Sequence, residues 1–220
     1  MYFKDRAEAG IKLSDGLQKF KNQDAVIYAL PRGGIPIGVE IAEALNLPLD
    51  LIIARKIGHP ESREYAIAAV TENGQMVSNS LEVRKVNQEW FTSQIEEERT
   101  EAQRRRKLYM AGRKSVDPAG KIAILVDDGI ATGLTVEAAI LDLRKRGPSR
   151  LILAVPVAPA ETVRRLSRLV DECIVLDAPE FFQGAIGAYY EYFPQLSDDD
   201  AIQMLNLVTP RKAEHAWQSS

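Results

Sequence analysis

The sequence has only one cysteine, Cys173, and two histidines in 220 residues. One cysteine excludes an internal disulfide and cannot form a zinc site alone, which fits a reducing environment. No apolar run approaches the roughly 20 residues that a membrane span needs, and the polar start MYFKDRAEAG contains no apolar signal core. The net charge of −3 argues neither for nor against nucleic acid. We therefore expect a cytoplasmic protein that does not contact a membrane.

The composition, 45% hydrophobic and 27% charged, is that of a globular protein. A chain of 220 residues is long enough to bury one full-sized core. The sequence contains no internal repeat and no low-complexity tract that would divide it. We therefore predict a single domain over residues 1–220.

Short apolar, β-branched runs alternate with helical patterns along most of the chain. Most of these runs are apolar throughout, which is typical of strands buried on both faces. The alternation predicts βαβ units and a parallel sheet with helices on its faces. The candidate strands are residues 25–30, 49–55, 66–70, 121–126, 150–157 and 172–178. The candidate helices between them are residues 34–46, 135–146 and 159–169.

Residues 86–113 form a long, charged helical segment outside this alternation. Four consecutive basic residues, 104–107, suggest one function, RNA binding. Acidic residues at 96–98 and 101 precede them on neighbouring turns and neutralise them at i,i+4-type spacing. A salt-bridged helix face or a dimer contact is therefore the better explanation, and we expect no nucleic-acid partner.

The stretch ILVDDGIATGLT, residues 124–135, places two adjacent carboxylates at the end of an apolar strand. Ligands of open parallel sheets bind at the carboxyl ends of the strands. Because side chains alternate along a strand, Asp127 and Asp128 should reach different partners. An isolated acid pair is explained equally well by a solvated helix cap, so its role depends on the residues that follow.

The residues after the acid pair form a turn suited to an anion. Small residues let backbone N–H groups point inward, and the N-terminus of the next helix adds partial positive charge. Two threonine hydroxyls add further donors. The turn consists of Ala131, Thr132, Gly133, Leu134 and Thr135. Acids and turn together suit a ribose 5-phosphate, with the sugar hydroxyls on the acids and the phosphate in the turn.

A second tight loop follows the predicted strand at residues 25–30. Its glycines permit close approach of the backbone to a ligand, and its arginine offers two donors to phosphate oxygens. The loop consists of Pro31, Arg32, Gly33 and Gly34. Alone it is better explained as a plain strand–helix connection, and its significance comes from its combination with the first motif.

The 124–135 stretch closely resembles the phosphoribosyl pyrophosphate (PRPP) signature of the type I phosphoribosyltransferases. It departs from that signature at Gly129, where the family usually has an aliphatic residue. Across the chain, FKDRAEAG, ALPRGG, RKIG and YYEYFPQLSDDD resemble the branch of the family known as predicted phosphoribosyltransferases. The resemblance implies an α/β fold with an open, mainly parallel, five-stranded sheet flanked by helices and a small hood from the termini.

The resemblance also implies roles for the motifs. Asp127 and Asp128 would bind the ribose diol as catalytic residues, and residues 131–135 would hold the 5′-phosphate. Residues 31–34 would hold pyrophosphate in a loop that in the family often contains a cis peptide, here the bond preceding Arg32. The hood, with a C-terminal helix, would come from residues 179–209 and would supply the acceptor pocket.

The family places a mobile lid after the second core strand. Here that position holds Arg55 and Lys56, which the resemblance implies as catalytic partners of pyrophosphate, followed by the polar residues 58–64. A closing lid excludes water from a cationic sugar that would otherwise hydrolyse. His59 lies in this stretch, and a loop histidine is more often simply solvated. Glu64 and Tyr65 are further candidates.

The implied reaction is attack of a nitrogen nucleophile on C1 of PRPP with release of pyrophosphate, through an oxocarbenium-like transition state. Mg²⁺ is the implied cofactor because it bridges pyrophosphate and ribose hydroxyls while it keeps several waters. It would bind through PRPP, and a direct bond to Asp127 or Asp128 is not required. Relatives are commonly dimers, so a homodimer is implied by analogy.

The acceptor is a nitrogenous molecule whose identity the sequence leaves open. Relatives that act on 6-oxopurines carry an aspartate at the position of Ala131, which disfavours hypoxanthine–guanine chemistry. Adenine-, orotate- and uracil-type acceptors remain open. A regulator of the same fold, which binds PRPP or a nucleotide without turnover, is the alternative function; the presence of Arg32, Arg55 and Lys56 favours an enzyme.

Overall fold

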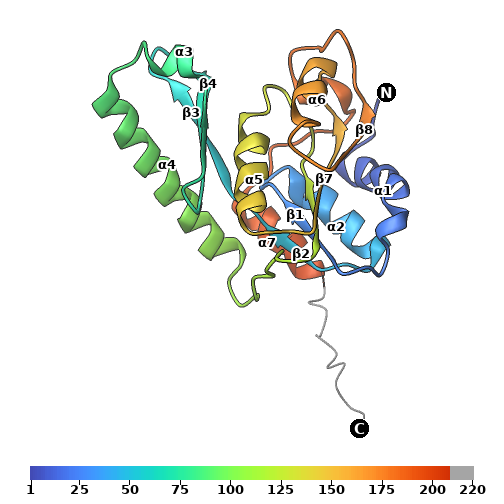
Figure 1. Ribbon diagram of the computed structural model, residues 1–220. Coiled ribbons are helices and arrows are strands. Elements are labelled where there is room, and N and C mark those ends of the chain that lie inside the picture. The colour runs from blue at the N-terminus through green and yellow to red at the C-terminus, as the bar shows by residue number, and fades with distance from the viewer. Residues whose placement is uncertain (209–220) are drawn as a thin grey trace.

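The computed structural model describes residues 1–208 of the chain (Figure 1). Its centre is a five-stranded sheet in the order β2-β1-β6-β7-β8, and every neighbouring pair is parallel. The strands are β1 (Ala25–Ala29), β2 (Leu49–Leu51), β6 (Ile122–Val126), β7 (Arg150–Val157) and β8 (Glu172–Asp177). The predicted α/β fold with an open, parallel, five-stranded sheet is confirmed.

Helices cover both faces of this sheet. Alternate residues of one strand face opposite layers, so in β1 Ile27 packs in the core of one face and Tyr28 in that of the other. On the first face lie α1 (Arg6–Gly16) and α2 (Gly34–Leu45), with a 3₁₀ turn at Gln18–Phe20 after α1. On the second face lie α5 (Leu134–Lys145) and α6 (Ala160–Leu166).

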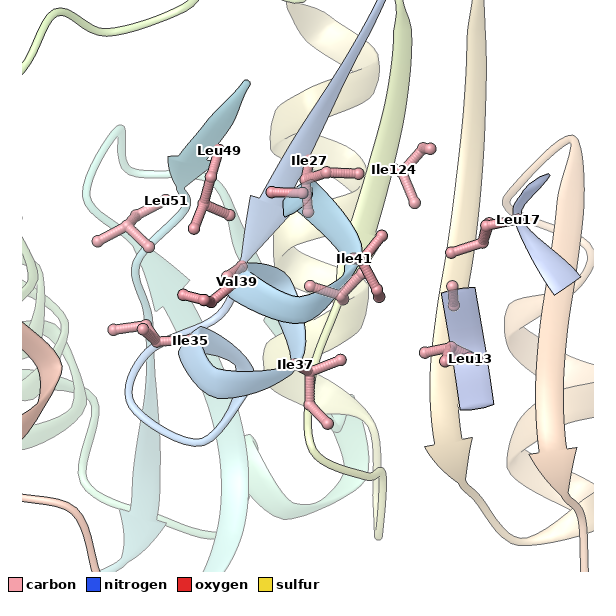
Figure 2. Packing of buried hydrophobic residues seen from close by; sticks show 14 of the residues in the cluster. Leu13, Leu17, Ile27, Ile35, Ile37, Val39, Ile41, Leu49, Leu51 and Ile124 are labelled. Atoms are coloured by element: carbon pink, nitrogen blue, oxygen red, sulfur yellow. The ribbon is translucent and has the colours of Figure 1, made fainter. Parts of the chain in front are cut away.

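The core of the first face is built around α2 (Figure 2). Ile35, Ile37 and Ile41 of this helix are fully buried, and they share one cluster with Ile27 and Ile124 of the sheet and with Leu13 of α1. Gly38 makes the contact close, because a Cβ atom there would lie 2.9 Å from Leu49 Cδ1. This packing fixes α2, and therefore the loop that precedes it, against the tips of β1 and β6.

The predicted helices 34–46, 135–146 and 159–169 correspond to α2, α5 and α6. The first two agree within a residue at each end. The third ends early, at Leu166, and the chain then turns into β8. Pro159 stands at its N-cap, as a proline near the first turn indicated.

Residues 54–109 form an arm that separates from the five-stranded sheet (Figure 1). The arm contains a three-stranded antiparallel sheet in the order β3-β4-β5. Its elements are β3 (Ala54–His59), β4 (Ser62–Thr71), β5 (Met76–Ser78), α3 (Ser80–Val83) and α4 (Gln88–Tyr109). Its own small core includes Ile57, Ile67, Val70 and Phe91. The predicted charged helix over 86–113 is α4.

The prediction of one strand over residues 49–55 is wrong. The run is interrupted at Ile52 and Ile53, between the body (the five-stranded sheet with its helices) and the arm. Both residues are buried, so the sequence stays apolar across the interruption. Leu49–Leu51 pairs with β1, whereas the chain from Ala54 pairs with β4. Residues 66–70 do form a strand, but it pairs antiparallel within the arm rather than in the main sheet.

The root of the arm is fixed to the body by buried polar contacts. Thr71 Oγ1 donates to Asp142 Oδ2 of α5 at 2.5 Å, and Asn73 Nδ2 donates to Asp142 Oδ1 at 3.0 Å. The Ile53 N–H donates to Glu72 Oε2 at 2.8 Å, and the Glu72 N–H donates to the Ile53 carbonyl at 3.1 Å. The two chain segments that enter and leave the arm are therefore joined to each other.

The predicted hood region contains a 3₁₀ turn at Ile186–Tyr189 and the helix α7 (Asp198–Leu207). Phe3 near the N-terminus forms a β-bridge with Tyr190, so the N-terminal segment meets the hood region. The division into one domain with a hood stays a prediction. Residue 209 and the tail from Pro210 lie outside the described residues. Within residues 1–208, no helix is long and apolar enough to cross a membrane.

Candidate functional site

The acid pair, the turn and the glycine loop meet at one edge of the main sheet. Asp127 and Asp128 follow β6, and the loop 31–34 follows β1. Because β1 and β6 are parallel neighbours, with Ala29 beside Val126, their carboxyl ends lie together. The predicted sugar and pyrophosphate motifs are therefore adjacent in space, although about 95 residues separate them in sequence.

The loop 31–34 packs directly on the acid pair. A Cβ atom at Gly33 would lie 1.9 Å from Asp128 Oδ2, and one at Gly34 would lie 2.8 Å from the Val126 carbonyl oxygen. No larger residue fits at either position without moving the acid pair. The peptide bond between Pro31 and Arg32 is cis, as the resemblance implied.

Asp128 is buried and paired with Arg6 of α1. Arg6 Nε lies 2.7 Å from Asp128 Oδ2, and the two side chains are 9% and 11% exposed. Arg6 Nη1 also donates to the Pro194 carbonyl at 2.9 Å, and its guanidinium stacks 3.7 Å above the Phe193 ring. The Tyr190 hydroxyl donates to the Asp128 carbonyl at 2.6 Å. Residues of α1 and of the hood region thus hold this acid in place.

The sequence reasoning gave Arg6 no role. The residue lies within FKDRAEAG, but its partner is 122 residues away. An ion pair at this separation leaves no local pattern in one sequence. A basic residue in an amphipathic N-terminal helix was the sole available signal, and such residues are usually solvated.

The two carboxyl groups have different environments. The Asp128 N–H donates to Asp127 Oδ1 at 2.9 Å, and within residues 1–208 Asp127 has no basic partner. Burial raises the pKa of Asp127 well above its usual range, and the neighbouring Asp128 carboxylate raises it further. Burial also raises the pKa of Asp128, and the Arg6 guanidinium opposes that rise. Arg6 therefore stabilises the charge on Asp128, whereas a charge on Asp127 has no basic partner within the described residues.

In the turn 131–135, two backbone carbonyls accept hydrogen bonds from side chains of α6. Gly133, at φ 82°, is the N-cap of α5, and no side chain caps this helix end. Thr162 Oγ1 donates to the Ala131 carbonyl at 3.1 Å, and Arg165 Nη2 donates to the Thr132 carbonyl at 2.6 Å. Arg165 also pairs with Glu137 of α5. These contacts from α6, which sequence reasoning missed, leave the N–H side of the turn to an anion.

Arg32 extends from the glycine loop towards α7. Its Nη1 lies 3.1 Å from Asp198 Oδ1, and the Tyr109 hydroxyl donates to the same oxygen at 2.6 Å. A cavity of about 270 Å³ lies beside Arg32, Gly33 and Arg6, and residues 193–196 form its other wall.

A family model described as "Phosphoribosyl transferase domain" matches residues 6–192. The chain belongs to the phosphoribosyltransferase family. Proteins from two strains of Mycobacterium tuberculosis, provisionally named phosphoribosyl transferases, are 37% identical to it over 206 residues, 93% of this chain and 46% of each relative. The chain thus spans about half the length of these relatives.

A protein from Thermus thermophilus of known crystal structure is 36% identical to this phosphoribosyltransferase family member, with a TM-score of 0.78. The match covers 93% of this chain and 98% of that chain. The predicted family is confirmed.

The structure places the predicted lid residues of this family member on the arm. Arg55 Nε pairs with Glu98 of α4 at 2.5 Å, and Lys56 Nζ pairs with Glu64 across the hairpin at 2.8 Å. Among residues 1–208, neither forms a hydrogen bond or ion pair with the acid pair or the glycine loop. Their role in binding pyrophosphate stays a prediction.

His59 and Tyr65 lie near the end of the same hairpin. His59 Nδ1 accepts from the Glu61 N–H at 3.2 Å, and its ring centroid is 6.5 Å from that of Tyr65. The ring pair belongs to the hairpin itself, and within the described residues neither side chain forms a hydrogen bond to the acid pair. A catalytic role for His59 also stays a prediction.

The oxygen donors of the site suit a hard cation. Within the described residues, no group of three or more His, Cys, Asp or Glu side chains could enclose a metal ion. Mg²⁺ usually binds through one or two carboxylates together with substrate phosphates and water. Asp127 fits this pattern better than Asp128, because Arg6 already occupies an oxygen of Asp128.

Proposed function

We propose that the chain catalyses Mg²⁺-dependent transfer of the 5-phosphoribosyl group from PRPP to a nitrogen acceptor, with release of pyrophosphate. One observation carries the proposal: the glycine loop is pressed against the acid pair, with Gly33 in contact with Asp128. In PRPP, C1 of the ribose carries the pyrophosphate, and the two hydroxyls of the diol are on the adjacent carbons, C2 and C3. The contact between the loop and the acids supports binding of both groups of one PRPP molecule.

Each segment has a separate part in binding. The N–H groups of residues 131–135 and the N-terminus of α5 bind the 5′-phosphate. Asp127 and Asp128 accept hydrogen bonds from the ribose hydroxyls, and residues 31–34 bind pyrophosphate through backbone N–H groups and Arg32. Holding both ends of PRPP orients C1 for attack without a covalent intermediate on the protein.

The acid pair stabilises the charge that develops at the sugar. Asp128, kept ionised by Arg6, places a negative charge near the oxocarbenium-like centre. Asp127 has no such partner among the described residues, and burial beside Asp128 holds its pKa well above the usual range. Mg²⁺, when bound, supplies charge neutralisation for the leaving pyrophosphate.

The arm supplies the lid in this proposal. Arg55 and Lys56 are paired with Glu98 and Glu64, both exposed or partly exposed. Surface pairs of this kind contribute about 0–1 kcal/mol, so the side chains can turn to pyrophosphate when the arm closes. The acceptor is a nitrogenous molecule, and Ala131 disfavours a 6-oxopurine because it offers no side-chain contact to the base. The protein acts in the cytoplasm, as a homodimer.

The test is release of pyrophosphate from PRPP with Mg²⁺ and a panel of purine, pyrimidine and other nitrogen acceptors. We expect at least one acceptor to give turnover that disappears on chelation of the metal and in Asp127→Asn. Exposed Asp199→Asn, which has the same charge change, should retain the turnover.

A regulatory protein that binds PRPP or a nucleotide without turnover is the second candidate. It is favoured by one observation, that both lid cations are engaged with carboxylates of the arm itself. Saturable binding of PRPP with no pyrophosphate release for any acceptor would support this candidate against the enzyme.

A further inference from the structure

Arg32 reaches away from the acid pair to a carboxylate on the C-terminal helix. Among residues 1–208, Asp198 is its one ion-pair partner, at 3.1 Å. The two side chains are 26% and 30% exposed, so the pair is open to exchange with a solvent-borne anion. The same guanidinium is the side-chain donor that the proposed function assigns to pyrophosphate.

Asp198 is positioned independently of Arg32. It is the first residue of α7, where the positive end of the helix dipole favours a carboxylate. The first turn of α7 is fixed by a capping box between Ser197 and Asp200. The Tyr109 hydroxyl, at the end of α4, donates to Asp198 Oδ1 at 2.6 Å. Asp198 thus stays in place, and stays hydrogen-bonded, whether or not Arg32 is bound to it.

We propose that Asp198 is a built-in competitor for Arg32, whose carboxylate occupies the guanidinium that a phosphate oxygen of pyrophosphate also binds. This inference rests on the proposed function. Its consequence is that Asp198 weakens pyrophosphate binding and favours release of pyrophosphate after transfer. The contact leaves the ribose 5-phosphate subsite untouched, since that subsite is built from residues 127–135.

The exchange of partners costs little. When Arg32 turns to pyrophosphate, Asp198 keeps the Tyr109 hydroxyl and the helix terminus, and Arg104 Nη2 of α4 lies 3.9 Å from Asp198 Oδ2. The hydrogen bond from Tyr109, followed by that from Arg32, holds the pKa of Asp198 below its usual range. The competitor therefore remains an anion throughout the neutral pH range.

Isothermal titration calorimetry with inorganic pyrophosphate at fixed Mg²⁺ tests the proposal. We expect Asp198→Asn to bind pyrophosphate about two- to fivefold more tightly than the unmodified chain, the range for a partly exposed ion pair. The affinity for ribose 5-phosphate should not change. Asp199→Asn is the matched control, because it removes the same charge from the next residue, which is exposed and has no ion pair in the described chain.

A double-mutant cycle separates competition from a general effect on the fold. In an Arg32→Ala background, Asp198→Asn should leave pyrophosphate affinity unchanged, because the guanidinium for which Asp198 and pyrophosphate compete is absent. Equal pyrophosphate affinity of Asp198→Asn and Asp199→Asn, with ribose 5-phosphate bound normally, would overturn this inference and leave the proposed function standing. Failure of the unmodified chain to bind either ligand would overturn both.

Discussion

At the scale of single residues, the two neighbouring carboxyl groups of the site have different hydrogen-bond and ion-pair partners. Asp128 has a buried guanidinium at 2.7 Å, whereas Asp127 has a backbone N–H group. The first arrangement stabilises a charge and the second leaves the charge poorly solvated. The same residue type therefore contributes differently to folding and to chemistry at adjacent positions.

Exchange of each acid for its amide should show this difference. Asp127→Asn removes a poorly solvated charge, so we expect activity to fall by about 100-fold or more while the free energy of unfolding at pH 7 stays equal or rises. Asp128→Asn leaves Arg6 buried without a charged partner, so we expect loss of activity and about 3–5 kcal/mol of destabilisation. Urea unfolding and PRPP turnover measure the two effects.

A variant that also replaces Arg6 is the control for the second exchange. Arg6→Met with Asp128→Asn should recover part of the lost stability, because neither charge is then buried alone. Equal destabilisation by Asp127→Asn and Asp128→Asn would contradict the assignment of the ion pair.

At the scale of elements, side chains of α6 bind the carbonyl groups of the turn 131–135. Arg165 donates to the Thr132 carbonyl at 2.6 Å and also pairs with Glu137 of α5. The side chain joins the turn, the helix after it and α6. A turn whose carbonyls are fixed in this way presents its N–H groups in one orientation, which is the preorganisation that anion binding needs.

Loss of this support should weaken phosphate binding. We expect Arg165→Ala to lower the affinity for ribose 5-phosphate about three- to tenfold, as loss of a charged hydrogen bond at a partly exposed site implies. Arg164→Ala is the matched control: Arg164 is the preceding residue, 61% exposed, and pairs with Glu180 rather than with the turn. Equal affinities of the two variants would show that α6 does not set the turn.

The root of the arm contains a buried acid that does not belong to the proposed site. Burial raises the pKa of Glu72 to about 7, with the Asp142 carboxylate adding to the rise and Arg106 opposing it. A carboxyl group whose pKa is higher in the folded than in the unfolded chain binds its proton more tightly when folded. Its contribution to stability is therefore lost as pH rises from about 4.5 to about 7.

Glu72→Gln keeps an acceptor for the Ile53 N–H and removes the titration. We expect the variant to gain stability over the unmodified chain as pH rises through this window, by up to about 3 kcal/mol above pH 7. Thermal or urea unfolding at pH 5 and pH 8 measures the difference. Exposed Glu61→Gln is the control with the same charge change. A variant that loses stability with rising pH as the unmodified chain does would contradict the account of Glu72.

At the scale of the whole molecule, the body could be predicted from the sequence because its strands and helices are marked by patterns of neighbouring residues. Apolar runs and helix signals located the five strands of the main sheet, and the acid pair and glycine loop fell at the ends of two of them. The split at Ile52 and Ile53 was missed, because a buried run looks the same whether it continues one sheet or passes between two. Arg6, Arg165 and Asp198 were missed because their contacts join distant segments.

The body and the arm have different parts in the proposed reaction. In the proposal, the sugar phosphate and pyrophosphate subsites lie on the body at the carboxyl ends of β1 and β6, and the arm carries Arg55 and Lys56. Tyr109 and Asp198 link the end of the arm helix α4 to the pyrophosphate loop through Arg32. Closure of the arm and binding of pyrophosphate would therefore both affect the contact between Arg32 and Asp198.

The most direct test of the account is a crystal structure of the chain with ribose 5-phosphate. The account predicts the phosphate against the N–H groups of residues 131–135, with the 2′- and 3′-hydroxyls on Asp127 and Asp128. A phosphate bound elsewhere, with the turn contacted by side chains of the protein instead, would contradict it.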